Sequence, residues 1–106
     1  MSNTIHIFKS ALDDLQNALD WYHSQSQGLE QRFSKEVNER LTFIAEHPEA
    51  SPVRAENFRG TQLKKFPYTI YYDFDEVNAV VHIAAVLHDK RDRKILKKRP
   101  WYNKLV

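Results

Sequence analysis

The sequence has 106 residues, of which 42% are hydrophobic and 28% are charged, with two glycines and no cysteine. These values are typical of one ordered globular domain over residues 1–106, and they exclude disulfide bonds, thiolate metal sites and cysteine nucleophiles. Because the chain shows neither a signal peptide nor an apolar run long enough to span a bilayer, we expect a cytoplasmic protein without a membrane anchor.

The net charge of +2 conceals a difference between the two halves of the chain. Residues 1–52 contain four Lys or Arg against eight Asp or Glu, a net charge of −4, whereas residues 53–106 contain twelve against six, a net charge of +6. Such an asymmetry predicts a basic surface that meets a polyanion or an acidic protein.

The N-terminal half predicts a strand followed by two helices. Residues 4–8 alternate apolar and polar side chains, which is the period of a half-buried strand. Ser10 is suited to be the N-cap of an amphipathic helix that ends near Gln25. After Gly28 a second amphipathic helix follows, and it ends before Pro48 because the residue preceding a proline disfavours helical geometry. The short link forces the two helices into an antiparallel hairpin.

The C-terminal half predicts four strands and then a basic tail with few apolar anchors. The first two strands are expected at residues 53–59 and 62–66, around Gly60, and the third at residues 68–74. The fourth, residues 80–88, is apolar on both faces and is therefore expected to be central. The predicted fold class is α+β: an N-terminal strand and a helical hairpin packed on a twisted antiparallel sheet, with a basic C-terminal tail.

Seven basic side chains flank the last two predicted strands: Arg59, Lys64, Lys65, His88, Lys90, Arg91 and Arg93. If these strands are neighbours, the cations gather at one end of the sheet, where they would hold phosphate groups by charge-assisted hydrogen bonds. Tyr68, Tyr71 and Tyr72 between them would stack on nucleic-acid bases. For any one cation, the alternative is a solvated sheet face whose lysines protect its edges. The gathering of seven favours a functional surface.

The five histidines lack the paired spacing of metal ligands, so we predict neither a metal site nor a cofactor. His88, near Arg91 at a strand end, is a candidate proton donor or phosphate contact, and the alternative is a histidine that only closes the strand. Four further aromatic residues are expected in the core or over the sheet edge: Trp21, Tyr22, Trp101 and Tyr102. A phosphate-binding glycine loop and a nucleophile elbow are both missing from the sequence, which disfavours conventional nucleotide-binding and hydrolase functions.

Several short motifs occur in a characteristic order along the chain. They are ALDDL at residues 11–15, the pair Trp21-Tyr22, FPYTIYY at residues 66–72, and IAAVLH at residues 83–88 followed by Arg91. Together with the predicted order of elements, they resemble the RelE/ParE superfamily of toxins from type II toxin–antitoxin systems, also called plasmid stabilisation proteins. The resemblance covers nearly the whole chain.

Members that resemble RelE cut messenger RNA in the ribosomal A site, and the resemblance then implies His88 and Arg91 as catalytic residues. Arg91 matches the family's arginine after the last strand, and Arg93 a second basic residue there. Thr69, however, stands where the RNA-cutting branch usually has an arginine, and Lys97 where it often has a tyrosine. These departures favour the ParE-like branch, which poisons DNA gyrase by binding.

The resemblance therefore implies a growth-inhibiting toxin that acts on DNA gyrase and is neutralised by a cognate acidic antitoxin, in a hetero-oligomer or with the toxin as a homodimer. One alternative is a ribosome-dependent endoribonuclease that acts on messenger RNA, and another is an inactive basic RNA-binding module. The expected target-binding residues are Arg59, Lys64, Lys65, Lys90, Arg91, Arg93 and Tyr71.

Overall fold

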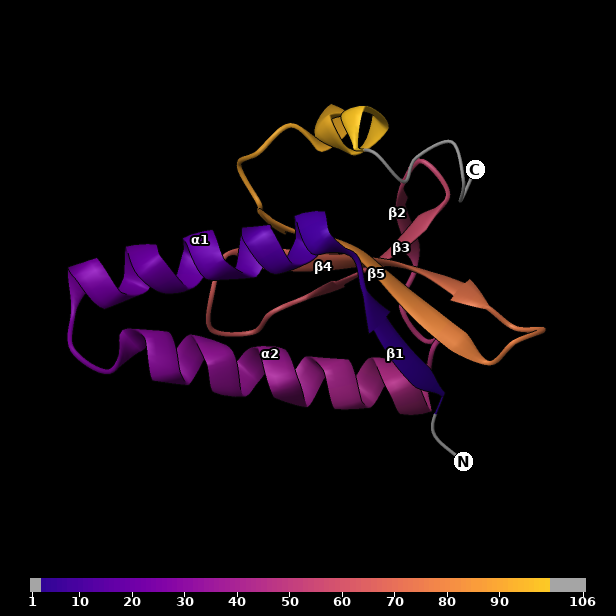
Figure 1. Ribbon diagram of the computed structural model, residues 1–106, viewed down its shortest axis with the longest axis horizontal. Helices are drawn as coiled ribbons and strands as arrows, with labels where there is room; N and C mark the ends of the chain where they lie inside the picture. The colour runs from indigo at the N-terminus through magenta and orange to yellow at the C-terminus, as the bar shows by residue number, and fades with distance from the viewer. Residues whose placement is uncertain (1–2, 100–106) are drawn as a thin grey trace.

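The computed structural model describes residues 3–99, in which a strand, two helices, four strands and a short 3-10 helix follow one another (Figure 1). Their bounds are β1 (Thr4–Ile7), α1 (Lys9–Gln25), α2 (Leu29–Glu46), β2 (Val53–Ala55), β3 (Phe58–Gln62), β4 (Tyr68–Asp75), β5 (Val80–His88) and η1 (Arg93–Lys98). The predicted α+β class is confirmed. Among the described residues, neither α-helix combines the length and hydrophobicity that a membrane span requires.

The five strands form one sheet in the order β1-β5-β4-β3-β2. β5 therefore lies inside the sheet, as its apolar faces predict, and it pairs with β4 along its whole length. β1 pairs with β5 in the parallel sense, with Ile5 opposite Val81 and Ile7 opposite Ile83. The sheet is thus mixed and not purely antiparallel, because the helical hairpin lies between β1 and the strands that follow it.

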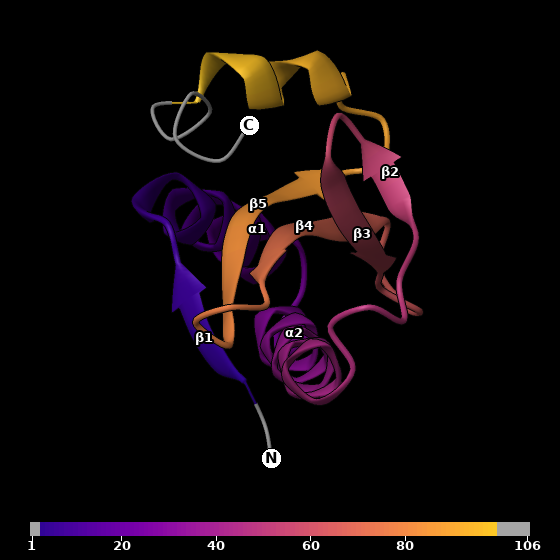
Figure 2. The same cartoon turned by 90° about the vertical axis from the view of Figure 1, so that its right-hand side faces the viewer.

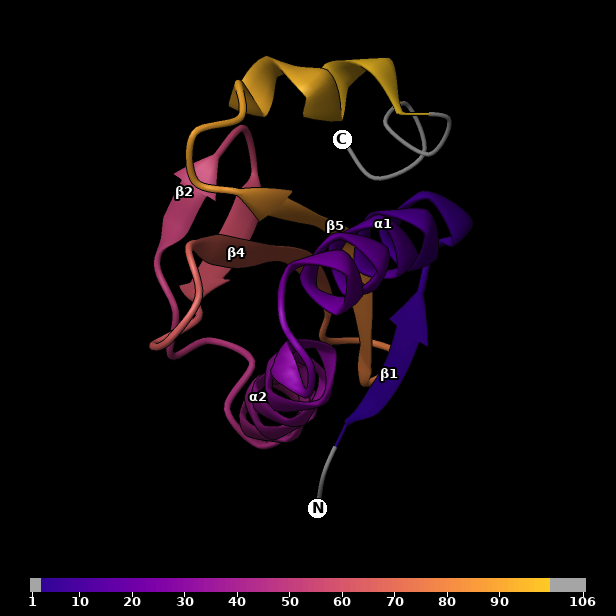
Figure 3. The same cartoon turned by 90° about the vertical axis from the view of Figure 1, so that its left-hand side faces the viewer.

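The sheet has helices on both faces (Figures 2 and 3). On the inner face, α1 and α2 pack against a core that includes Phe33, Ile44 and Ile83, all fully buried. On the outer face, η1 packs against a smaller cluster of six buried residues: Phe58, Tyr71, Ala84, Ala85, Leu87 and Leu96. The two clusters account for the apolar character of β5 on both sides.

The hairpin of β2 and β3 differs from the prediction. The turn occupies Glu56, whose φ of 51° is left-handed, and Asn57, whereas Gly60 lies inside β3 opposite Tyr71. A glycine inside a strand often permits close approach of another group. Here a Cβ on Gly60 would lie 2.6 Å from Cδ of Arg54, whose side chain crosses this position. The strand predicted at residues 53–59 is thus divided between β2 and β3. The strand predicted at residues 62–66 is wrong beyond Gln62, where β3 ends.

The helix ends are mostly as predicted, with α1 ending at Gln25 and α2 before Pro48. The predicted N-cap is wrong: α1 begins at Lys9, with Phe8 at the N-cap position. Tyr22 packs against the inner-face core, as expected, but Trp21 is 57% exposed, so its predicted burial is wrong. Trp101 and Tyr102 lie outside the described residues.

The predicted unanchored tail is wrong as far as Arg99. Leu96 of η1 is fully buried in the outer-face cluster, and the Arg99 guanidinium pairs with the Asp14 carboxylate at 2.8 and 3.1 Å. The same carboxylate accepts the backbone N–H of Val86 at 3.0 Å. Both charged side chains are at most one-tenth exposed. This pair therefore ties α1, β5 and the end of η1 together.

We predict that Asp14→Ala lowers the free energy of unfolding by about 3 kcal/mol, because it leaves a buried guanidinium and a buried N–H without their acceptor. Lys9→Ala, which removes an exposed ion pair with Asp13, is the matched control and should cost about 0.5 kcal/mol. Urea unfolding of the full chain measures both. Similar losses in the two variants would contradict a structural role for the Asp14 pair.

Candidate functional site

A hollow of about 170 Å³ opens on the outer face of the sheet, and we call it the arginine hollow. The segment between β5 and η1 passes beside β2 there (Figures 2 and 3). The lining side chains come from β2, β3, β4, that segment and the start of η1: Arg54, Gln62, Thr69, Tyr71, Asp89 and Arg93. Sequence reasoning predicted Tyr71 and Arg93 as target-binding residues, and the structure places them at this one hollow.

The two arginines are held by backbone carbonyl groups. Arg54 donates from Nε to the carbonyl oxygen of Gly60 at 2.8 Å, and Arg93 donates from Nη1 to the carbonyl oxygen of Arg54 at 2.6 Å. A guanidinium has five N–H donors in a planar fork, so each retains donors suited to a phosphate or carboxylate. Arg54 was missed by sequence reasoning. A glycine within a strand is the signal that could have pointed to a side chain crossing there.

The carboxylate of Asp89 accepts hydrogen bonds from two uncharged side chains. One carboxylate oxygen accepts from Oγ1 of Thr69 at 2.8 Å and the other from Nε2 of Gln62 at 2.7 Å. Its backbone N–H donates to the carbonyl oxygen of Pro67 at 2.8 Å. These bonds fix the start of the segment that carries Arg93. The carboxylate thus positions the hollow.

Two of the three tyrosines of β4, Tyr71 and Tyr72, do not present their rings to solvent. Tyr71 is 5% exposed, and Tyr72 is fully buried with its hydroxyl donating to the carbonyl oxygen of Pro48 at 2.8 Å. The prediction that Tyr71 and Tyr72 stack on bases is therefore wrong, whereas Tyr68 is half-buried. Burial raises the pKa of the Tyr71 phenol above its ordinary value, and the positive charge of Arg93 opposes that effect. Tyr71 is consequently a neutral phenol at pH 7, able to donate a proton but not to accept one.

His88 and Arg91 lie at the adjoining end of the sheet. His88 is paired with Tyr68 across β4 and β5, with ring centroids 5.2 Å apart. Its Nδ1 accepts the backbone N–H of Lys90 at 3.1 Å. Burial raises the pKa of Tyr68, whereas the nearby charge of Arg91 lowers it. Arg91 and Lys90 are exposed, so this end of the sheet presents cations to solvent.

The other predicted cations lie elsewhere, so the seven do not form one cluster. The Arg59 guanidinium donates to the carbonyl oxygens of Glu49 and Ser51, at 3.1 and 2.7 Å, and thereby supports the loop after α2. Lys64 and Lys65, in the loop between β3 and β4, line a separate groove beside α2. Sequence order brings these residues to the same region of the chain, but strand pairing and side-chain direction separate them.

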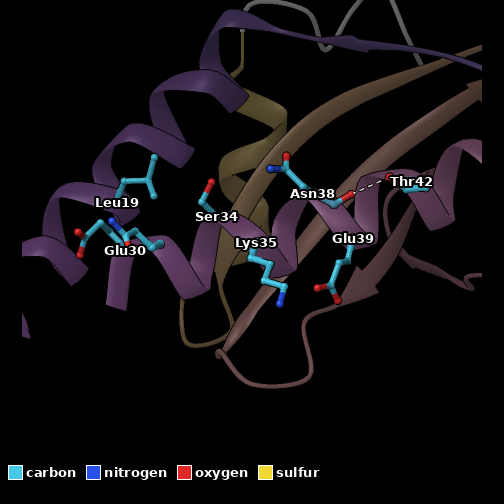
Figure 4. A pocket seen from close by; sticks show the side chains of 8 residues that line it. Leu19, Glu30, Ser34, Lys35, Asn38, Glu39 and Thr42 are labelled. Carbon is cyan, nitrogen blue, oxygen red and sulfur yellow. Dashed lines mark hydrogen bonds between the residues drawn. The ribbon is translucent and has the colours of Figure 1, made fainter. Parts of the chain in front are cut away.

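A broad hollow of about 710 Å³ between α1 and α2 carries no catalytic constellation (Figure 4). Ser34 and Asn38 lie on the side of α2 toward α1, whereas Lys35 and Glu39 point away from it. A backbone hydrogen bond lowers the pKa of Glu30, and His23, 3.4 Å away, adds to this effect. Within residues 3–99, no three His, Cys, Asp or Glu side chains converge as metal ligands would.

A sequence profile of the family described as ParE toxin of type II toxin-antitoxin system, parDE, matches residues 5–93. The chain belongs to this family. It is therefore a toxin of a type II toxin–antitoxin system, as the sequence motifs implied. Comparison of this ParE-family toxin with curated protein sequences gave no match.

Solved structures of related toxins share the fold of this ParE-family toxin. The toxin–antitoxin complex RelBE2 from Mycobacterium tuberculosis is 18% identical, with a TM-score of 0.55 over 83% of this chain and 99% of that chain. A mutant of the E. coli toxin RelE in the free state is 15% identical, with a TM-score of 0.59 over 92% and 93%. The isolated E. coli RelE toxin is 15% identical, with a TM-score of 0.57 over 92% and 95%. These likenesses concern the fold.

We predict that Gly60→Ala displaces the Arg54 side chain and lowers the free energy of unfolding by about 1 to 2 kcal/mol, because the added methyl group overlaps Cδ of Arg54. In an Arg54→Ala background most of this loss should disappear, because the obstructing side chain is gone. A double-mutant cycle by urea unfolding measures the coupling. Equal losses in both backgrounds would contradict the crossing of Arg54 over Gly60.

Proposed function

We propose that this ParE-family toxin arrests growth by binding DNA gyrase, with the arginine hollow and the neighbouring Arg91 as its contact surface. The single observation that carries the proposal is a hollow with two carbonyl-anchored guanidinium groups, whose one carboxylate, Asp89, accepts hydrogen bonds from Gln62 and Thr69. Such a site can bind an anionic group firmly.

RNA cleavage sets a stricter chemical requirement. The 2′-hydroxyl must lose a proton and the leaving oxygen must gain one, while cations stabilise the charge on phosphorus. In the arginine hollow both Asp89 oxygens already accept hydrogen bonds, and the pKa of Tyr71 is raised. His88 lies at the sheet end, where Nδ1 accepts a backbone N–H. These features support target binding over cleavage.

The two departures from the RNA-cutting branch also have structural roles in this chain. Thr69, which stands in place of an arginine, donates to Asp89, and Lys97, in place of a tyrosine, forms an ion pair with Glu56 at 3.5 Å. Thr69 thereby supports a wall of the hollow, whereas Lys97 links η1 to the turn between β2 and β3. This supports the ParE-like branch for the toxin's target.

We further propose that an acidic antitoxin neutralises the toxin in the cytoplasm, and that residues 1–106 act as one toxin domain. The net charge of +6 in residues 53–106 supports an acidic partner, because opposite charge speeds association and selects the partner. A solved structure with the same fold is a toxin–antitoxin complex, which also supports this assignment. Assembly as a hetero-oligomer with the antitoxin follows from the proposal.

Expression without the antitoxin should stop growth, and Arg91→Ala should relieve the arrest without a change in the thermal midpoint, because Arg91 is exposed. Lys98→Ala, an exposed change on η1, is the control and should remain toxic. Colony counts and thermal unfolding of each variant are measured together. A normally folded Arg91→Ala protein with full toxicity would remove Arg91 from the contact surface.

The purified toxin should inhibit DNA supercoiling by gyrase or trap cleaved DNA, because it binds without needing a general base. Ribosomes programmed with messenger RNA should yield no new 5′ ends in the A-site codon. Cuts in the A site with normal supercoiling, lost in His88→Ala, would establish the endoribonuclease alternative instead. Absence of both effects would support the inactive RNA-binding module.

A further inference from the structure

A second basic surface lies between α2 and the loop that joins β3 to β4, and we call it the lysine groove. Its volume is about 370 Å³. Phe66 and Leu29 supply apolar walls, and Phe66 is 9% exposed. The basic side chains that line it are Arg32, Lys35, Arg40, Lys64 and Lys65. None of these lines the arginine hollow.

The groove is held in shape by a buried carboxylate. Glu36 of α2 is 8% exposed, and its two oxygens accept the backbone N–H groups of Lys64 and Lys65, the latter at 2.9 Å. The loop is thereby fastened to the helix through its backbone, so the two lysine side chains are not needed for the fastening. Substitution of these lysines leaves both donors in place.

The charges that line the groove are unbalanced. Five basic side chains face two acidic ones, Glu36 and Glu39, and Glu36 is already engaged by backbone N–H groups. In addition, Nε of Arg40 is buried and has no hydrogen-bond partner in the described part of the chain. The Arg40 guanidinium lies over the Phe43 ring, 5.3 Å from its centroid, which places this cation beside an apolar surface.

Two features favour an acidic peptide over a nucleic acid as the ligand of the groove. The apolar walls formed by Leu29 and Phe66 fit an apolar side chain, which a phosphate backbone lacks. Glu39 on the rim would repel closely spaced phosphates, whereas a peptide can place its carboxylates opposite the cations and avoid this position. An acidic segment with one apolar anchor therefore matches both the excess of positive charge and the apolar walls of the groove.

We propose that the lysine groove binds an acidic segment of the antitoxin through its carboxylates and one apolar anchor. The identity of the partner rests on the proposed function, but the preference of the groove for an acidic peptide does not. The groove is lined by α2 and the loop before β4, and the hollow by β2, β3, β4, Asp89 and Arg93. Because they share no lining residue, we treat the two surfaces as separate sites.

The test uses the full chain and a fluorescent synthetic peptide of Glu and Asp residues around a single Phe. Fluorescence anisotropy should show that the double variant Lys64→Glu, Lys65→Glu binds the peptide at least about tenfold more weakly than the unaltered protein. The matched control is Lys94→Glu, Lys98→Glu on η1, which makes the same change in net charge away from the groove. It should weaken binding less than about twofold at physiological salt.

Replacement of the peptide's Phe by Ser should also weaken binding, because the apolar walls lose their occupant. Thermal unfolding checks that the variants fold, and Lys64→Gln with Lys65→Gln, a milder change, should give a smaller loss in the same direction. Equal weakening in the groove and control variants would overturn the proposal, since long-range charge alone would then explain binding. Tighter, groove-dependent binding of labelled oligothymidylate than of peptide would overturn it in favour of a nucleic acid.

This assay needs neither toxicity nor gyrase, so its outcome is separate from that of the proposed function. If the peptide binds in the groove but gyrase is unaffected, the target assignment is wrong and the groove assignment stands. If an antitoxin co-purifies with the toxin while groove variants bind the peptide normally, the toxin–antitoxin function stands and the groove assignment is wrong.

Discussion

One buried carboxylate, that of Asp14, allows the short sheet of this toxin to carry a helix on its outer face. β1 pairs with β5 only as far as Ile83, so the backbone of β5 beyond that point lacks a strand on this side. Asp14 from α1 accepts the N–H of Val86 there and simultaneously binds Arg99. A carboxylate that accepts from both a backbone N–H and a guanidinium satisfies groups whose burial alone would be unfavourable.

The arginine hollow depends on this arrangement. With Arg99 fastened at one end and Leu96 buried on the sheet, η1 holds the preceding segment over β2, where Arg93 reaches the carbonyl oxygen of Arg54. The hollow is therefore assembled from strands and a tail that are distant in sequence. Gly60 completes it, because the missing side chain lets Arg54 cross the strand.

The basic half of the chain divides its charge between surfaces with different chemistry. The hollow presents guanidinium groups beside a hydrogen-bonded carboxylate, which suits anion binding. The lysine groove combines cations with apolar walls, which suits a peptide. If the two surfaces act as we propose, the toxin meets its target and its neutralising partner through different residues, because the hollow and the groove share no lining side chain.

The sequence by itself determined the features that depend on local periodicity: the helical hairpin, the strands at residues 68–74 and 80–88, and the family motifs. It also placed Arg93 and Tyr71 among the functional candidates. Only the tertiary structure decided that Gly60 lies within a strand, that Arg54 joins the hollow, and that the cations separate. These outcomes depend on contacts between distant residues, such as Arg99 with Asp14, 85 positions apart. A local pattern reports which face of a helix or strand is apolar, but it does not report which distant polar group will meet that face.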